Sequence, residues 1–136
     1  MRSGLVAALA TLAAVVAGEA APLEPLRLEL NALETAEGRC RASFVIENKG
    51  DTAFESLRLE LALFNRTGIV QRRLATEMGP LRAAKTIVKT FTIEDPCDDI
   101  GAILLNDVTA CTPGDPAHCL DRLALSSRIE KVRFYK

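Results

Sequence analysis

The chain has 136 residues, of which 49% are hydrophobic and 26% charged, and its formal net charge is −1. This length suits one domain with a hydrophobic core. The nearly balanced charge, with both signs interspersed, excludes a nucleic-acid binder that works by electrostatic attraction.

The N-terminus has the pattern of a secretory signal peptide. Arg2 precedes an uncharged run from Leu5 to Ala17, and the small residues Gly18 and Ala20 follow. We expect cleavage after Ala20, which makes residues 1–20 the signal peptide and leaves a mature domain, residues 21–136, exported to the periplasm. The alternative is an uncleaved anchor, but the apolar run is shorter than the roughly 18–20 residues that span a bilayer. No second apolar run predicts a membrane span after signal cleavage.

The first two strands are predicted from alternating apolar residues. The first covers about residues 26–33, and residues 34–38 form a turn. In the second strand the apolar side chains share one face, as in an antiparallel sheet with one wet face. These residues are Cys40, Ala42, Phe44 and Ile46.

The third strand, at about residues 57–63, has leucine at every second position between turn signals at residues 48–51 and 65–68. Leucine and its neighbours also favour helices, but this spacing would leave no apolar stripe on a helix, so a strand is predicted. Residues 69–76 form a weaker, polar strand typical of a sheet edge. Residues 78–84 form a loop.

The remaining strands are expected at residues 86–93, 103–111 and 123–135, the last bent or interrupted near residues 126–128. Between them, residues 112–118 contain prolines that cannot continue a ladder and are predicted as a loop. About seven short strands with these turns predict an all-β, immunoglobulin-like antiparallel sandwich after the signal peptide.

Two motifs support this fold by resemblance. Residues 45–50 read Val-Ile-Glu-Asn-Lys-Gly, and residues 63–68 read Leu-Phe-Asn-Arg-Thr-Gly. They resemble bacterial FxLYD-type immunoglobulin-like domains, in which one strand ends in Asn before a Gly turn and another ends in Leu-Tyr-Asp. The strand of Phe91 then corresponds to a later Phe-containing strand, and the resemblance covers about residues 26–93. The whole chain also resembles small exported alphaproteobacterial proteins, which implies no mechanism.

Four cysteines remain after cleavage, which in an exported domain predicts two disulfides. Three connectivities are possible. Because the second and fifth strands of such a sandwich are antiparallel neighbours, Cys40 and Cys97 come to the same end of one sheet. Our first choice is therefore Cys40–Cys97 together with a local Cys111–Cys119 bridge.

A metal site is the first alternative use of these residues. His118, Cys119 and Cys111 with Asp115 or Asp121 could supply ligands for a metal-binding or metal-chaperone protein. The seven residues between the two cysteines, however, do not match the short spacing of structural zinc sites, and His118 is the sole histidine. We therefore predict a disulfide-bonded loop and no cofactor.

A hydrolase is the second alternative. Ser126 and Ser127 are the serines closest in sequence to His118, but no nucleophile-elbow motif surrounds them. A carboxylate pair could also serve glycoside chemistry, although the chain lacks tryptophan for a sugar platform. The candidate acids, which are also typical turn formers, are Asp95, Asp98, Asp99 and Asp107.

The remaining function is contact with a partner, for which we expect another envelope protein. The strand at residues 69–76, with Arg72 and Arg73, could accept a partner strand at its edge. The basic and apolar tail at residues 128–136 is the second candidate, through Arg133, Phe134 and Tyr135. Against these stand a charged edge that opposes pairing and an ordinary final strand. The sequence thus predicts an exported, non-enzymatic β-sandwich that serves as an accessory or protein-interaction module of the cell envelope.

Overall fold

The computed structural model describes residues 2–15 and 25–136, so the cleavage position expected after Ala20 lies outside the described residues. Residues 2–15 contain no helix or strand, and their side chains are exposed. Within the described ranges no helix is long and apolar enough to cross a membrane.

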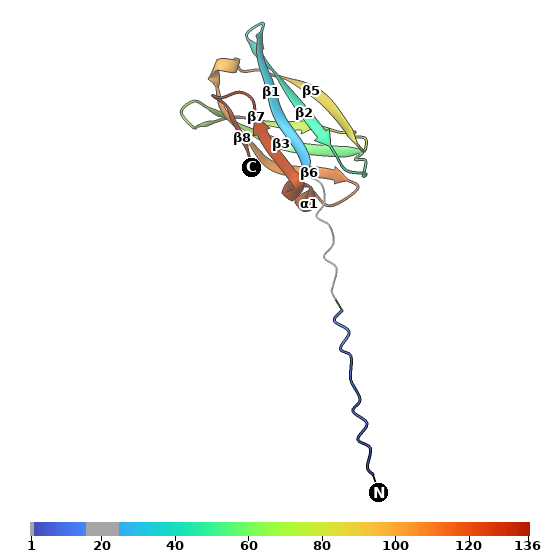
Figure 1. Cartoon of the computed structure of the whole chain (residues 1–136). Coiled ribbons are helices and arrows are strands. Elements are labelled where there is room, and N and C mark those ends of the chain that lie inside the picture. The colour runs from blue at the N-terminus through green and yellow to red at the C-terminus, as the bar shows by residue number, and fades with distance from the viewer. Residues whose placement is uncertain (1, 16–24) are drawn as a thin grey trace.

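The rest of the described chain forms two four-stranded sheets, one ordered β5-β2-β1-β7 and the other β4-β3-β6-β8 (Figure 1). The strands are β1 (Leu26–Ala36), β2 (Arg39–Asn48), β3 (Ser56–Asn65), β4 (Val70–Glu77), β5 (Lys85–Ile93), β6 (Ile100–Thr112), β7 (Leu123–Ser127) and β8 (Arg133–Tyr135). A short 3-10 helix, η1 (Cys97–Asp99), precedes β6, and the helix α1 (Pro116–Arg122) precedes β7. The all-β sandwich predicted from the sequence is therefore confirmed.

The C-terminal strands differ from the prediction of about seven antiparallel strands. The expected interruption near Ser127 is present, and it divides the last strand into β7 in the first sheet and β8 in the second. Ser127 holds this turn, because its hydroxyl donates to the Val132 carbonyl at 2.7 Å and accepts the Ile129 N–H at 3.1 Å. Both new strands pair in parallel, β7 with β1 and β8 with β6, whereas β1 to β6 pair antiparallel in the order of an immunoglobulin sandwich.

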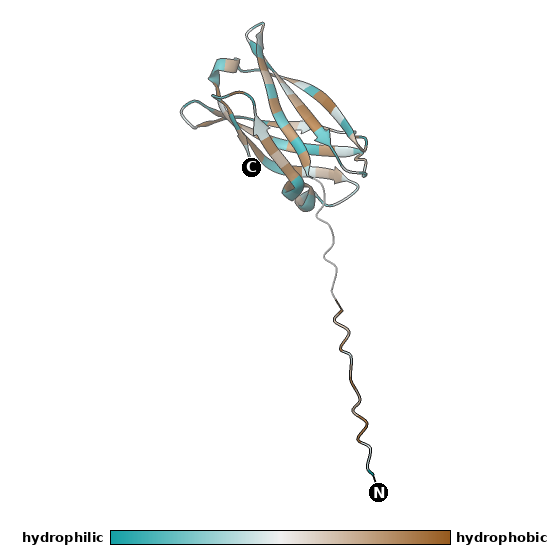
Figure 2. Ribbon diagram, in the orientation of Figure 1, coloured by the Kyte–Doolittle hydropathy of each residue, from teal (hydrophilic) through white to brown (hydrophobic). Residues whose placement is uncertain are grey.

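The core follows from the period of two in the sequence. The alternating leucines of β3 are buried with at most 1% exposure, and the Cys40-to-Ile46 face of β2 is buried as well. Figure 2 shows the alternation of hydropathy along the strands. Phe44 on β2 packs edge-on against Phe134 on β8, with ring centroids 5.5 Å apart, so the inward faces of both sheets meet in one core.

The loop predicted over residues 112–118 is only half correct, since α1 begins at Pro116. Asp115 caps this helix by accepting the Ala117 N–H at 2.8 Å. Proline ends a β ladder but fits the first turn of a helix, where its missing N–H costs nothing. The prolines were therefore interpreted correctly as strand breakers and incorrectly as marking a loop throughout.

The predicted disulfides are both present. Cys40 at the start of β2 is bonded to Cys97 of η1, and Cys111 near the end of β6 is bonded to Cys119 of α1. The cysteine side chains at Cys40, Cys111 and Cys119 are buried, so the bridges lie against the core. Each fastens a non-strand segment, η1 or α1, to one of the sheets.

Candidate functional site

Side chains alternate between the two faces of β8, and this places the predicted contact residues of the tail on opposite faces. Phe134 pairs with Ile103 of β6, and both side chains are buried in the core. Phe134 is therefore not available to a partner, which corrects the sequence prediction for this residue. Arg133 and Tyr135 lie on the opposite, outer face of the sheet, where the Arg133 guanidinium stacks 4.0 Å from the centroid of the Tyr135 ring.

The two arginines of β4, Arg72 and Arg73, also lie on opposite sides of their strand. Arg73 lies on the outer face and binds Glu60 of β3 at 3.1 Å. Arg72 lies on the side of β4 that carries Leu74 and Thr76 toward the core, and its Nε donates to Asp95 at 2.7 Å. The hydrogen bond and charge of Asp95 raise the pKa of Arg72 above its usual value.

This placement bears on the predicted strand addition. β4 is an edge strand, as expected, because it pairs only with β3 in its sheet. Arg72, however, is a charged side chain on the core-facing side of that edge, and such residues oppose pairing with a further strand. The position of Arg72 therefore disfavours the addition of a partner strand to β4.

An apolar group of side chains lies on the outer face of the second sheet. Phe64 of β3 stands beside Ala102 of β6, which stands beside Arg133 of β8. One row further along, Ala62 stands beside Leu104, which stands beside Tyr135. Ala62 is buried at 4% exposure, and we call the four partly exposed apolar and aromatic members of these rows the outer patch: Phe64, Ala102, Leu104 and Tyr135.

The outer face of the first sheet is different in character. Its side chains are mostly polar or charged, and Ser43 and Thr90 share a hydrogen bond of 2.9 Å there. Glu29 accepts hydrogen bonds from Asn31 at 2.8 Å and from Arg128 at 3.0 Å, which hold its pKa below the usual value. Val88 of β5 and the neighbouring Val45 of β2 are apolar exceptions there. The outer patch is a partly exposed apolar group on a face that also carries the charged residues Arg58, Glu60 and Arg73.

A depression of about 320 Å³ adjoins the outer patch at the turn between β3 and β4. Arg66 of this turn and Arg133 of β8 both line it, together with Phe64, Ala102 and Tyr135. The Arg66 Nε donates to the backbone carbonyl of Asp98, which fastens the arginine to η1. The depression thus combines two cations with two aromatic rings and small residues.

The four acids proposed for a hydrolase do not all gather in one place, although Asp98 and Asp99 line one depression. Asp98 and Asp99 lie together on η1, both exposed, and Asp95 is bound to Arg72. Asp107 stands beside Glu60 in the middle of β3, whereas Ile100, next to η1, stands beside Asn65, the last residue of β3. That separation along β6 is roughly 20 Å, and carboxylates of glycosidases lie about 5–10 Å apart.

Two of the residues proposed for metal binding form a disulfide with each other. Cys111 and Cys119 are joined in a disulfide and cannot act as thiolates, and His118 is exposed on α1. Among the described residues no group of three or more His, Cys, Asp or Glu side chains could hold a metal ion. The metal-chaperone alternative needs free thiols, and the described residues contain no free cysteine.

The sequence interpretation missed Arg66 and Phe64 as surface residues. Phe64 follows the leucine strand out of phase with its core residues, so the alternation alone places its side chain on the outer face. Arg66 was assigned to a turn, and its position beside Arg133 follows only from the pairing of β6 with both β3 and β8.

No family model, curated protein or solved structure matches the chain. The resemblance to FxLYD-type domains therefore stays a prediction.

Proposed function

We propose that the protein is an exported, non-enzymatic domain that binds another protein of the cell envelope through the outer patch. Its compartment is the periplasm, reached through the N-terminal signal peptide. The FxLYD-type resemblance is part of the same proposal and implies a structural, non-catalytic role for the sandwich.

Two features support export, namely the exposed apolar run at the N-terminus and the two disulfides. Leu5, Leu9 and Leu12 are each more than 90% exposed, so the apolar N-terminal run contributes nothing to the core of the domain. An apolar run after a basic residue at the N-terminus is typical of a signal peptide that directs a protein to export. Two disulfides, with no free cysteine among the described residues, suit an oxidising compartment.

The observation that carries the proposal is the apolar outer patch flanked by arginines. A solvent-facing sheet surface is ordinarily polar, as the first sheet of this protein demonstrates. Tyrosine and arginine are enriched in protein interfaces, and Tyr135 and Arg133 occupy the margin of the patch as a stacked pair.

The test is co-purification from crosslinked envelope extracts with a variant that places charge in the patch. Ala102→Glu introduces a carboxylate at the centre of the patch, and Ala124→Glu introduces the same group on the exposed outer face of β7 as the matched control. We expect the wild type and the control to recover the same defined partner, and Ala102→Glu to lose it. Repeated recovery of the domain alone, or equal recovery with both variants, would contradict the proposal.

A further inference from the structure

We infer that the depression lined by Arg66 and Arg133 receives carboxylate side chains from an acidic segment of the partner protein. This inference rests on the proposed function and adds the chemistry of the partner. It places the acidic groups of the segment on the two guanidinium groups and its neighbouring apolar side chains on the outer patch.

The first reason for an acidic ligand is the positive charge of the depression. Its lining includes two arginines and no acidic residue. Arg72 and Arg73 on the neighbouring strand are each bound to a carboxylate within 3.1 Å, whereas Arg66 and Arg133 have no carboxylate within 4.0 Å among the described residues. Asp98 and Asp99 line a second depression together with Arg66, so the positive site is confined to the depression that Arg66 shares with Arg133. A depression of one sign favours a ligand of the opposite sign.

The second step is that both guanidinium groups are held in place before any ligand binds. The Asp98 carbonyl accepts the Nε hydrogen of Arg66, and the Tyr135 ring supports the plane of Arg133. A planar guanidinium that is already oriented loses less side-chain entropy when it binds a carboxylate in a bidentate manner. The pair is therefore better prepared for a carboxylate than freely rotating surface lysines would be.

The third step concerns space and continuity. Gly68, Gly101 and Ala102 line the depression with little or no side chain, which leaves its volume open between the two arginines. Ala102 and Phe64 belong to both the depression and the outer patch, so the two surfaces are continuous. A segment of a protein with acidic and apolar side chains can contact both, whereas a small free anion would use the depression alone.

The experiment measures binding of two labelled hexapeptides to the mature protein by fluorescence anisotropy at about 20 mM salt, where exposed charges are weakly screened. One peptide is Glu-Glu-Leu-Phe-Glu-Glu and the other is Gln-Gln-Leu-Phe-Gln-Gln. The test variant is Arg66→Gln/Arg133→Gln. The matched control is Arg27→Gln/Arg41→Gln, which removes the same charge from exposed positions on the outer face of the first sheet.

We expect the wild type to prefer the acidic peptide, and the test variant to bind it at least about tenfold more weakly while the control stays within about twofold. The single variants Arg66→Gln and Arg133→Gln, measured alongside, give intermediate losses and keep the test decisive if the double variant does not fold. Equal binding of both peptides, or an equal loss in the control, would overturn the inference.

Vesicles containing phosphatidylglycerol serve as a third probe. Binding to these vesicles without binding to the acidic peptide would overturn the inference in favour of an anionic lipid surface. Absence of binding to any probe would overturn it as well. If Ala102→Glu still abolishes partner recovery in that case, the proposed function stands and only the acidic chemistry of the partner is wrong.

Discussion

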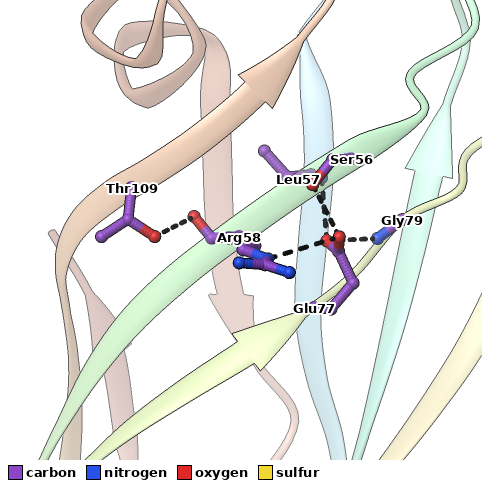
Figure 3. A network of polar contacts seen from close by, with 6 residues as sticks. All are labelled: Ser56, Leu57, Arg58, Glu77, Gly79 and Thr109. Carbon is purple, nitrogen blue, oxygen red and sulfur yellow. Dashed lines mark hydrogen bonds and ion pairs between the residues drawn. The ribbon is translucent and has the colours of Figure 1, made fainter.

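Glu77 at the end of β4 fastens the following loop to the start of β3, and its removal should destabilise the sandwich (Figure 3). Its carboxylate accepts hydrogen bonds from the Ser56 hydroxyl at 2.6 Å, the Leu57 N–H at 2.9 Å and the Gly79 N–H at 3.3 Å. Arg58 adds an ion pair at 3.8 Å. Two backbone donors thus depend on one side chain.

The magnitude follows from what each substitution leaves behind. Glu77→Ala removes every acceptor, and hydrogen bonds to a charged group each contribute about 1.5–3 kcal/mol. Because the Glu77 side chain is 38% exposed, water replaces part of this, and we expect a total loss of about 2–3 kcal/mol. Glu77→Gln keeps one acceptor oxygen for the Leu57 and Gly79 amides and can donate to Ser56, so we expect a loss of about 1 kcal/mol.

The pH dependence gives a second, independent readout. Burial alone would raise the pKa of Glu77, but its hydrogen bonds with Ser56, Leu57 and Gly79, assisted by Arg58, outweigh this and hold the pKa below 4.5. A depressed pKa contributes stability that is present above the unfolded-state value and is lost as the pH falls through the folded-state value. The difference in unfolding free energy between wild type and Glu77→Gln should therefore be largest at neutral pH and shrink as the pH falls below 4.5.

The assay is urea unfolding followed by circular dichroism, at neutral pH and at a series of acidic values. Glu55→Gln is the matched control, because Glu55 is exposed and lies only two residues from Leu57. We expect the control to match the wild type within about 0.5 kcal/mol. A Glu77→Ala variant as stable as this control, or a Glu77→Gln difference that does not change with pH, would show that the Glu77 carboxylate does not stabilise this part of the sandwich.

Two further predictions concern stability. Replacing Cys40 and Cys97 together by serine should cost about 4 kcal/mol in the chain-entropy model, and replacing Cys111 and Cys119 about 2.5 kcal/mol, because the residues joined are 57 and 8 apart; equal midpoints of urea unfolding for the two variants would contradict this order. Gly101→Ala should lose about 1–3 kcal/mol, since the new Cβ would lie 2.5 Å from a backbone carbonyl oxygen of the β3–β4 turn, and an unchanged unfolding midpoint would show that the backbone yields easily.

The strands of the first two-thirds of the chain could be predicted because their local period and their tertiary burial agree. The leucines of β3 alternate in sequence and are all buried, and the Asn48 turn signal marks the true end of β2. What the sequence does not reveal there is that Asn48 is itself buried. Its side chain donates to the backbone carbonyls of Thr52 at 2.8 Å and Arg82 at 3.1 Å, thereby joining two loops.

The C-terminal part was harder because tertiary pairing decides it. β8 has three residues, too few to show a period, and its parallel pairing with β6 is a long-range contact without a local signal. The helix α1 did leave a signal, an Asp before Pro116 that is typical of a helix start, but the strand-breaking meaning of proline was given more weight.

The sequence identified candidate contact residues by their type, but it did not show on which face of its strand each of them lies. Of the residues predicted for partner contact, Arg73, Arg133 and Tyr135 share one outer face. Arg72 and Phe134 fall on the other side of their strands, as the alternation requires. To predict which side chains of a short strand are exposed, one must know which side of the strand faces the core. That side depends on the strands with which it pairs.

The most direct test of partner binding through the outer patch is site-specific photo-crosslinking in the native envelope. A photo-reactive amino acid replaces Leu104 in the patch, and in a second strain it replaces Val45, which is similarly half-buried on the outer face of β2. We predict one discrete crosslinked protein of defined mass from the Leu104 position and none from the Val45 position. Equal crosslinking from both positions, or no adduct from Leu104, would contradict the central claim.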